Sequence, residues 1–426
     1  MKVLSVVGAR PNFVKIAPLL AVMRKQLGLE ARLVHTGQHF DPEMSKSFFH
    51  DLDIPEADYD LEVGPGSHAV QSAEVMKRLE PILLAEQPDV VVVVGDVNST
   101  MAAALTAVKL GIPVAHVEAG LRSSDRTMPE EINRVVTDAV SDLFLVSEPS
   151  GVDNLLREGR PWERIFLVGN VMIDTLQRYL AAARRSTILA DLGLANGNGN
   201  KSHARYVVLT LHRPALVDGL EGFRAIWHSV EEIAREAPVI FPAHPRTKKN
   251  LQLAGLGKLM EASPVKRSNG VRVIPPLGYL DFLCLQSEAA LVITDSGGIQ
   301  EETTALGVPC LTVRDSTERP ITVTEGTNTL VGINPRCLRE EAKRALEGNG
   351  KRGRKPALWD GRCAERIVNV LREVYGTRAQ RPAVARRKTF VPAHRARVWS
   401  PEVSSLSRTG EVIQRTGPVG VGRRIA

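Results

Sequence analysis

Five consecutive valines, Val90–Val94, place the strongest constraint on how this chain folds. Valine is branched at Cβ and favours extended backbone. A run without polar alternation gives a strand that has no face suited to water, and such strands occur in parallel sheets covered by helices on both sides. The run therefore predicts an α/β protein that contains a parallel sheet.

Short apolar runs of this kind alternate with longer helical patterns through the first half of the chain. The predicted strands are residues 3–7, 31–36, 90–94, 114–117, 143–146 and 165–168. The predicted helices are residues 13–26, 99–110, 130–140 and 149–157. Strands that alternate with helices predict βαβ units wound around one sheet.

The alternation stops at residues 181–205 and then resumes. This interval contains Asn196-Gly197-Asn198-Gly199-Asn200, which predicts a flexible loop near residues 195–204. A second series of strands is predicted at residues 206–211, 239–243, 271–274, 290–294 and 309–313, and a last helix at 363–374. We therefore predict two doubly wound Rossmann-like domains, residues 1–169 and 170–360, that face a central cleft.

The positive charge of the chain belongs to its last segment. The whole sequence has a formal charge of +7, which is typical of nucleic-acid-binding proteins. However, eleven Lys and Arg but only two Asp and Glu lie in residues 378–426, so the preceding residues are slightly acidic. This distribution argues against a nucleic-acid partner and predicts a basic, disordered tail from residue 378 to 426.

Cysteine usage and hydropathy point to a cytoplasmic protein. The four cysteines form no Cys-x-x-Cys pair, which is typical of reduced thiols rather than disulfides or a zinc site. No apolar run approaches the roughly 18 residues that span a membrane. We expect neither a membrane anchor nor a structural metal.

The segment Asp295 to Glu302, with the sequence DSGGIQEE, predicts a diphosphate site. It follows a predicted strand and opens a helical pattern, so free backbone N–H groups and the helix dipole would face an anion. Gly297 and Gly298 allow close approach of the phosphates, together with Ser296. Glu302, about one turn further on, is placed to accept the hydroxyls of a ribose. The alternative is an ordinary helix cap with an acidic first turn.

Polar side chains follow many of the predicted strands, where ligands bind in open α/β sheets. These residues are Arg10, Asp96, Glu118, His212, Arg213, His244, Arg246, Ser296 and Arg314. The cations among them, with Lys15 and Arg319, suit phosphates. Lys15 has the alternative of a solvated surface lysine. The carboxylates Asp96 and Glu118, with the pair Glu130 and Glu131, are better explained as proton carriers or hydroxyl acceptors.

Other enzyme classes lack their motifs in this sequence. The first predicted strand is followed by Gly8-Ala9-Arg10-Pro11-Asn12 rather than by G-x-G-x-x-G. No Tyr-x-x-x-Lys pair, P-loop or H-E-x-x-H is present. These absences argue against an oxidoreductase, a P-loop kinase and a metalloenzyme.

Six motifs in this order resemble the non-hydrolysing UDP-N-acetylglucosamine 2-epimerases. They are Gly8-Ala9-Arg10-Pro11, Gly95-Asp96, residues 116–122 (HVEAGLR), residues 129–134 (PEEINR), residues 295–302 and Thr317-Glu318-Arg319-Pro320. The resemblance extends from Met1 to about Tyr375. It implies a GT-B architecture in which a C-terminal helix, residues 361–377, returns to the first domain.

The resemblance implies interconversion of UDP-GlcNAc and UDP-ManNAc without NAD, metal or any other cofactor, for surface polysaccharide supply. UDP is eliminated across C1–C2 to leave a glycal and then adds back with inverted C2. Matched by motif, the acid/base group would be Asp96, Glu118 and Glu130, or Glu131 if the register shifts by one, with His212 on the diphosphate. A homodimer is also implied.

The same resemblance assigns the substrate-binding residues. They would be Arg10, Lys15, Arg213, His244, Phe282, Ser296, Gly297, Gly298, Glu302 and Arg319, with Phe282 beside the uracil. Gln38 and His39 resemble a segment that binds a second, activating UDP-GlcNAc. Asn12 departs from the pattern, because many members have Glu there. The tail after Arg378 has no counterpart.

Four alternatives to this function stay open. A hydrolysing 2-epimerase would release UDP and free ManNAc, and related epimerases act on UDP-sugars modified at C3 or C6. A GT-B glycosyltransferase would need an acceptor site. A nucleotide-sugar sensor would bind UDP-GlcNAc without proton exchange at C2.

Overall fold

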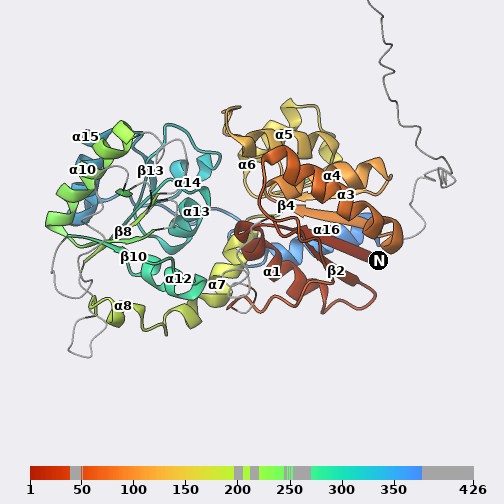
Figure 1. Cartoon of the computed structure of the whole chain (residues 1–426), viewed down its shortest axis with the longest axis horizontal. Coiled ribbons are helices and arrows are strands. Elements are labelled where there is room, and N and C mark those ends of the chain that lie inside the picture. The colour runs from red at the N-terminus through yellow and green to blue at the C-terminus, as the bar shows by residue number, and fades with distance from the viewer. Residues whose placement is uncertain are drawn as a thin grey trace, which may run out of the picture. The chain divides into compact units, whose positions relative to one another are not determined.

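A computed structural model describes residues 1–38, 49, 51–195, 205–211, 220–243, 247, 249, 251–252 and 270–376. Within these residues the chain forms two sheets, and every recorded strand pairing is parallel (Figure 1). The fold is therefore of the two-sheet, GT-B-like α/β class that the sequence predicts.

The first sheet has seven strands in the order β3-β2-β1-β4-β5-β6-β7. Its strands are β1 (Lys2–Val7), β2 (Glu30–His35), β3 (Tyr59–Asp60), β4 (Val90–Val94), β5 (Val114–Val117), β6 (Leu143–Val146) and β7 (Ile165–Leu167). Its helices are α1 (Arg10–Met23), α3 (His68–Glu86), α4 (Asn98–Lys109), α5 (Pro129–Val140), α6 (Pro149–Arg157) and the short 3-10 helix η1 (Trp162–Arg164). Strand order reverses between β1 and β4, the position where ligands bind in doubly wound sheets.

The five valines of β4 explain how this sheet is buried. Val90, Val92 and Val94 belong to a core cluster with α1 and α16 (Cys363–Tyr375). Val91 and Val93 belong to a separate cluster with α3 and α4 on the opposite face. Because successive side chains of a strand point to opposite faces, an all-valine strand packs against helices on both sides.

The second sheet has six strands in the order β10-β9-β8-β11-β12-β13. They are β8 (Val207–Thr210), β9 (Val239–Pro242), β10 (Val271–Ile274), β11 (Leu291–Thr294), β12 (Cys310–Thr312) and β13 (Asn328–Leu330). The helices of this half are α7 (Val171–Ala183), α8 (Ile188–Asp191), α10 (Leu220–Glu236), α12 (Tyr279–Ser287), α13 (Gly297–Leu306), α14 (Pro320–Thr324) and α15 (Pro335–Arg344), followed by a π-helical turn (Ala345–Asn349).

Every predicted strand is present with ends that agree to within one residue. The prediction for the first helix is wrong by three residues, because α1 already begins at Arg10 and carries Pro11 within its first turn, where the missing N–H costs nothing. The two-residue strand β3, the last strand β13 and helix α3 were not identified. Only three side chains of α3 are fully buried, so its apolar pattern is weak.

Two helices link the halves of the chain. The last helix, α16, packs against α1 and α7, and α7 also packs against α12 and α13. Asp174 of α7 accepts hydrogen bonds from the first two backbone N–H groups of α16, those of Cys363 (3.1 Å) and Ala364 (2.7 Å). These contacts hold α16 against α1, the helix that carries Arg10 and Lys15. No helix among the described residues is long and apolar enough to span a bilayer.

Candidate active site

Three strand ends of the first sheet carry predicted site residues. Arg10 is the first residue of α1 after β1, Asp96 follows β4, and Glu118 follows β5. Strand β4 pairs in parallel with both β1 and β5, so these residues lie at one edge of the sheet. The switch between β1 and β4 therefore brings a cation and two carboxylates together, as the sequence predicts.

Glu118 and Lys15 form a buried ion pair between Oε2 and Nζ. Only 4% of the Lys15 side chain and 2% of the Glu118 side chain are exposed, so Lys15 is not a solvated surface lysine. Gly95 lies against the pair: a Cβ there would sit 3.1 Å from Lys15 Nζ and 3.4 Å from Glu118 Oε2. Glycine at this position leaves room for the two charges to meet.

The backbone at Glu118 is in the left-handed region, with φ of 70°. A non-glycine residue there costs about 1 kcal/mol or more and persists only where surrounding contacts enforce it. The Glu118 N–H donates to the carbonyl of Leu145 on β6 at 2.9 Å. The turn after β5 thus directs a buried carboxylate toward Lys15 at the expense of local backbone energy.

Asp96 is held by Arg134 of α5, whose Nη1 donates to Asp96 Oδ2 at 2.5 Å. Asn133 donates from Nδ2 to the Asp96 carbonyl at 2.9 Å. Burial raises the pKa of Asp96, but the positive charges of Arg134, Lys15 and Arg319 outweigh it and lower the pKa overall. Asp96 is therefore an ionised carboxylate that can accept a proton.

The two glutamates at the start of α5 have different surroundings. Glu131 is buried, accepts hydrogen bonds from the N–H groups of Ser123 and Ser124, and pairs with Arg134 at 2.8 Å. Glu130 is exposed, and its carboxylate makes no hydrogen bond or ion pair to another described residue. Glu131 therefore fixes Arg134, whereas the Glu130 carboxylate is available to a ligand.

In the second sheet, α13 begins at Gly297, after β11 and the N-cap Ser296. No side chain caps the first turn of α13, so its backbone N–H groups can bind a ligand. A Cβ on Gly297 would lie 2.5 Å from Glu318 Oε1, and one on Gly298 would lie 3.1 Å from Met172 Cε. The two glycines therefore allow the side chains of Glu318 and Met172 to approach the first turn of α13 closely, and the N-terminus of a helix without a side-chain cap can bind an anion.

Arg319 connects the two sheets. Its Nε pairs with Glu301 of α13 at 2.8 Å, its Nη1 lies 3.6 Å from Glu318 Oε1, and its Nη2 lies 3.7 Å from Glu118 Oε1. Glu301 also accepts a 2.9 Å hydrogen bond from Asn170. A guanidinium that is only 5% exposed therefore sits among carboxylates from both halves of the chain.

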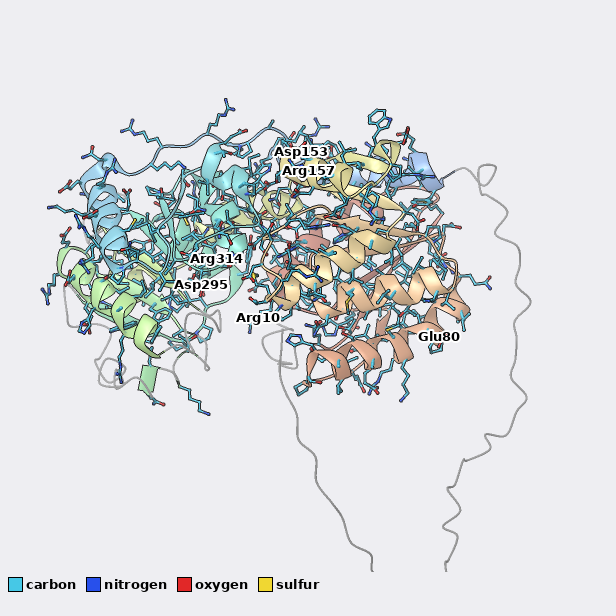
Figure 2. All side chains as sticks on the ribbon, turned by 90° about the horizontal axis from the view of Figure 1, so that it is seen from above. Arg10, Glu80, Asp153, Arg157, Asp295 and Arg314 are labelled. Atoms are coloured by element: carbon cyan, nitrogen blue, oxygen red, sulfur yellow. The ribbon has the colours of Figure 1, made fainter. Side chains whose placement is uncertain are left out.

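In the second sheet, Asp295 follows β11 and Arg314 follows β12 (Figure 2). Arg314 pairs with Glu318 at 2.8 Å, the same carboxylate that lies beside Gly297. Arg314 and Arg319 thus place two cations close to the start of α13, where the sequence predicts a diphosphate.

Glu302 lies one residue beyond Glu301 and is also buried. The hydroxyl of Tyr279 on α12 donates to its Oε1 at 3.3 Å. Burial raises the pKa of Glu302 to about 7, against the opposing hydrogen bond from Tyr279. Phe282, on the same helix as Tyr279, is half-buried. This arrangement offers a carboxylate for hydroxyl groups and an aromatic ring on a neighbouring helix.

Several predicted residues lie outside the described part of the chain. They are His39, His212, Arg213, His244 and Arg246, with the loop at residues 196–204 and the tail from residue 378. Gln38 is described: its Oε1 accepts hydrogen bonds from the N–H (3.0 Å) and hydroxyl (2.7 Å) of Ser99. Gln38 is therefore attached to the first turn of α4.

Sequence reasoning missed the residues that hold the site together. The motifs named above contain Arg134, Asn133 and Glu318, but no role was predicted for these residues. Arg134 and Asn133 are far from Asp96 in the sequence, so their contacts with it could not be inferred. Asn12 was noted only as a departure. Its Oδ1 accepts from the N–H groups of Gly8 and Ala9, and its Nδ2 donates to Val94, so it ties the end of β1 to the end of β4.

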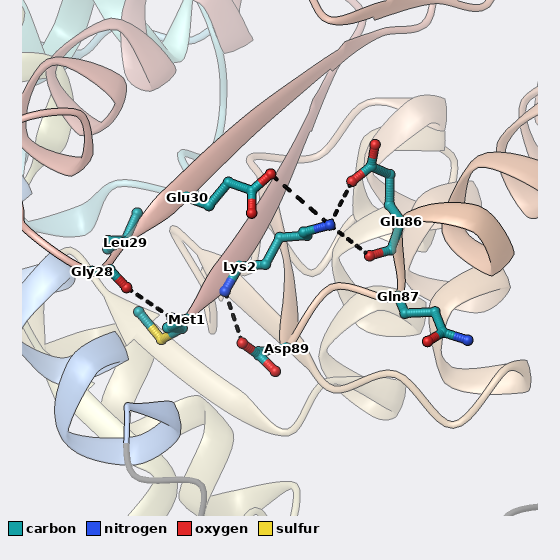
Figure 3. A pocket seen from close by; sticks show the side chains of 8 residues that line it. All are labelled: Met1, Lys2, Gly28, Leu29, Glu30, Glu86, Gln87 and Asp89. Atoms are coloured by element: carbon teal, nitrogen blue, oxygen red, sulfur yellow. Dashed lines mark hydrogen bonds and ion pairs between the residues drawn. The ribbon is translucent and has the colours of Figure 1, made fainter.

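The opposite edge of the first sheet has a different character. A polar depression at the amino end of β1 is lined by Met1, Lys2, Gly28, Leu29, Glu30, Glu86, Gln87 and Asp89 (Figure 3). Lys2 already pairs with Glu86 at 2.9 Å, and its N–H donates to Asp89 at 2.7 Å. Within the described residues, no group of three or more His, Cys, Asp or Glu is arranged to hold a metal ion.

Known proteins are similar to this chain over most of its length. The family model for UDP-N-acetylglucosamine 2-epimerase matches residues 21–372. The UDP-N-acetylglucosamine 2-epimerase of Methanocaldococcus jannaschii is 42% identical over 87% of this chain and 99% of its own length.

The chain belongs to the UDP-N-acetylglucosamine 2-epimerase family.

Solved structures of the family share the fold. The Methanocaldococcus jannaschii epimerase in complex with UDP-GlcNAc and UDP superimposes with a TM-score of 0.79 at 41% identity, over 88% of this chain and all of that one. The Neisseria meningitidis epimerase bound to UDP-GlcNAc gives 0.77 at 31% identity over the same shares. The UDP-2,3-diacetamido-2,3-dideoxy-D-glucuronate 2-epimerase of Pseudomonas aeruginosa is 41% identical, over 81% of this chain and 92% of its own length. Family members with different sugar specificities are therefore about equally similar to this epimerase family member.

Proposed function

We propose that this protein interconverts UDP-GlcNAc and UDP-ManNAc without net hydrolysis. The observation that supports the proposal is the contact of Glu118 with both Lys15 and Arg319, because the proposed proton carrier of the first half would then lie beside the proposed anion site of the second. A reaction that breaks a C–H bond and a sugar–diphosphate bond on adjacent carbons requires both groups side by side.

The first step of the proposed reaction is an elimination. A carboxylate removes the proton from C2, the electron pair forms the C1–C2 double bond, and the C1–O bond breaks with its electrons leaving on UDP. Negative charge grows on the diphosphate, where Arg319 and the N-terminus of α13 would stabilise it. In the second step the UDP oxygen attacks C1, and a proton reaches C2 from the opposite face.

Inversion at C2 needs proton carriers on two faces of the sugar. Asp96 is proposed as the base: Arg134, Lys15 and Arg319 keep it ionised and thus free to accept a proton, at the expense of some basicity. Glu118 and Glu130 are the other proposed carriers, since Glu131 is engaged by Arg134 and two backbone N–H groups. Arg10 and Lys15 would bind the substrate beside them.

The uridine half of the substrate is proposed to lie on the second sheet. Ser296, Gly297 and Gly298 would cradle the phosphates, Glu302 would accept the ribose hydroxyls, and Phe282 would border the uracil. Family motifs add His212, Arg213 and His244 to the diphosphate and sugar sites, and add Gln38 and His39 to a second site for UDP-GlcNAc. These assignments rest on matched sequence positions.

The proposal extends to a cytoplasmic homodimer. The four cysteines are unpaired in the structure, which is what a reducing compartment favours. A supply of ManNAc-type sugars for surface polysaccharide is the role that fits such an enzyme.

A second candidate is 2-epimerisation of a UDP-sugar modified at C3 and C6. It is favoured by the 41% identity to the Pseudomonas aeruginosa epimerase, against 42% for the archaeal UDP-N-acetylglucosamine 2-epimerase. The chemistry at C1 and C2 would be the same, and only the contacts to C3 and C6 would differ.

Proton NMR of the full chain with UDP-GlcNAc in D₂O tests the proposal. We expect UDP-ManNAc with deuterium at C2 and no free ManNAc. Free ManNAc would identify a hydrolysing enzyme. Exchange seen only with a 2,3-diacetamido UDP-sugar acid would support the second candidate, and no exchange with either sugar would reject both.

The variants Asp96→Asn and Glu118→Gln test the assigned chemistry in the same assay. Each is expected to lower kcat by roughly 10²-fold or more, because a proton carrier is lost, while UDP affinity changes little. Glu163→Gln, an exposed carboxylate on η1, is the matched control. Wild-type rates in both site variants would remove these carboxylates from the mechanism.

A further inference from the structure

A wholly buried ion pair lies beneath the two carboxylates of the proposed site. His116 of β5 and Asp138 of α5 are each 0% exposed, and His116 Nδ1 lies 2.7 Å from Asp138 Oδ1. The other ring nitrogen, Nε2, lies 2.8 Å from the carbonyl oxygen of Gly95. The ring of His116 is thus held between the Asp138 carboxylate and the backbone carbonyl of Gly95.

The second oxygen of Asp138 holds the following turn. Oδ2 accepts a hydrogen bond from the N–H of Gly120 at 2.9 Å and pairs with Arg122 Nη1 at 2.8 Å. Burial raises the pKa of Asp138, but His116 and Arg122 outweigh it and lower the pKa overall. Arg122 pairs in turn with Glu158 at 2.7 Å, so it bridges the buried Asp138 and a partly exposed carboxylate.

The two backbone groups that this pair engages flank the candidate acid/base residues. Gly95 immediately precedes Asp96, and Gly120 lies two residues after Glu118. The backbone of Gly95, Glu118 and Gly120 is left-handed, with φ of 69°, 70° and 81°. Glycine adopts this region freely, whereas Glu118 keeps it only where surrounding contacts fix the turn.

We propose that the His116–Asp138 ion pair is a positioning device that sets the separation of Asp96 and Glu118. It acts through the Gly95 carbonyl on one turn and the Gly120 N–H on the next. Both side chains are too deeply buried to touch a substrate, so they are positioning residues. The inference rests on the proposed epimerase function and adds residues to it.

The pair should affect chemistry far more than binding. A displacement of about 1 Å between reacting groups costs on the order of 10² in rate. Among the described residues, the proposed uridine and diphosphate contacts come from α12, α13 and Arg319 in the second half of the chain, and no hydrogen bond or ion pair joins them to His116 or Asp138. Loss of the pair is therefore expected to lower kcat while KM for the UDP-sugar and the Kd for UDP stay nearly constant.

The test uses Asp138→Asn in the full chain. The substitution keeps size and removes the charge that faces His116. We expect kcat for C2 exchange to fall on the order of 10²-fold, with KM and the UDP Kd within about threefold of wild type. The conservative variant Asp138→Glu, which restores the charge, should recover part of the rate.

The matched control is Asp60→Asn. Asp60 also faces a histidine of the same sheet, His35 at 3.3 Å, but its side chain is 54% exposed and contacts neither turn. This variant should keep wild-type kcat and KM. If Asp138→Asn does not fold, as judged by its melting transition, His116→Gln is measured by the same criteria.

The outcomes separate this inference from the proposed function. A wild-type chain without C2 exchange on any UDP-sugar refutes the function. An active wild type with unchanged kcat in Asp138→Asn overturns the positioning role alone. A parallel loss of UDP binding and kcat, or failure of both variants to fold, also overturns it, because the pair would then be a general stability element.

Discussion

Two neighbouring glutamates of α13, Glu301 and Glu302, are buried, and burial disfavours the charged form of a carboxyl group. Burial raises the pKa of Glu302 to about 7, and it also raises the pKa of Glu301 despite the opposing charge of Arg319. A carboxyl whose pKa is higher in the folded state than in the unfolded chain stabilises the fold fully below its unfolded pKa. That stabilisation is lost as pH rises through the folded pKa.

The substitution Glu302→Gln removes one of these titrations. Relative to wild type, we expect the variant to gain stability progressively between pH 5 and 8, by up to about 3 kcal/mol, because wild-type Glu302 must ionise while buried. Urea unfolding at pH 5, 6, 7 and 8 measures the difference. The exposed Glu80→Gln variant (Figure 2) is the control. A difference that does not change with pH would contradict the assigned burial of this carboxyl.

The cations of the site explain why such carboxylates persist. Arg319 lies among Glu118, Glu301 and Glu318. Because Lys15 pairs with Glu118 and Arg314 with Glu318, removing Arg319 would take the cationic partner from the buried Glu301. The motif around Arg319 could be identified in the sequence. The contact between Arg319 and Glu301 could not be predicted, because it depends on how α13 and the segment before α14 pack in three dimensions.

At the scale of elements, α13 is the part of the site that the sequence predicted most completely. Its start at Gly297 and its end at Gly307 follow from the order of strand, two glycines, helix and C-terminal glycine. The element carries two separable properties: an open N-terminus beside Glu318, and a left-handed glycine at its C-terminal end, Gly307 with φ of 75°.

Alanine substitutions at the two ends of α13 separate these properties. In Gly297→Ala the new Cβ meets Glu318 2.5 Å away, and we expect UDP affinity to fall about tenfold or more, because one or two charge-assisted hydrogen bonds to the diphosphate are lost. In Gly307→Ala nothing lies within 4 Å of the new Cβ, but the left-handed backbone costs about 1 kcal/mol of stability.

Calorimetric titration with UDP and thermal unfolding measure both variants. Gly307→Ala should bind UDP as wild type does while melting earlier. Equal UDP affinities for the two variants would show that the N-terminus of α13 does not contact the diphosphate.

The sequence predicted the strands well and some helices poorly. Buried parallel strands are continuous apolar runs, as in β4 and β11, and they stand out from any surrounding pattern. Helix α3 has apolar residues with little burial, and β3 has two residues, so neither leaves a periodic pattern. Likewise the His116–Asp138 pair joins a strand to a helix 22 residues later, and no local rule connects them.

For the whole molecule, the described contacts end with α16. Asp174 caps this helix, and Arg366 Nε donates to the carbonyl of Val168 at 2.6 Å, so α16 is fastened to the segment that joins the two halves. The described site residues all precede residue 320, and the contacts that support α1 end at Tyr375.

A chain shortened after Gly376 is therefore expected to keep the kcat and melting temperature of the full protein. A chain shortened before Cys363 should unfold or lose activity, since α1 would lose a packing partner and Asp174 would be left buried without its N–H donors. Expression of both forms, followed by thermal unfolding and the C2 exchange assay, decides the matter. Loss of activity in the longer form would show that residues 377–426 take part in function.

The pairing of Lys15 with Glu118 has a consequence for the order in which the protein is made. Both residues belong to the first third of the chain and leave the ribosome long before Arg319. Glu118 therefore finds a counter-ion as soon as the first sheet folds, and the emerging half-protein does not carry an unmatched buried charge while synthesis continues. Arg319 then joins an arrangement that is already electrically balanced and brings Glu301 as its own partner. Each half can thus complete its charge pairs independently, and only their meeting assembles the reactive centre.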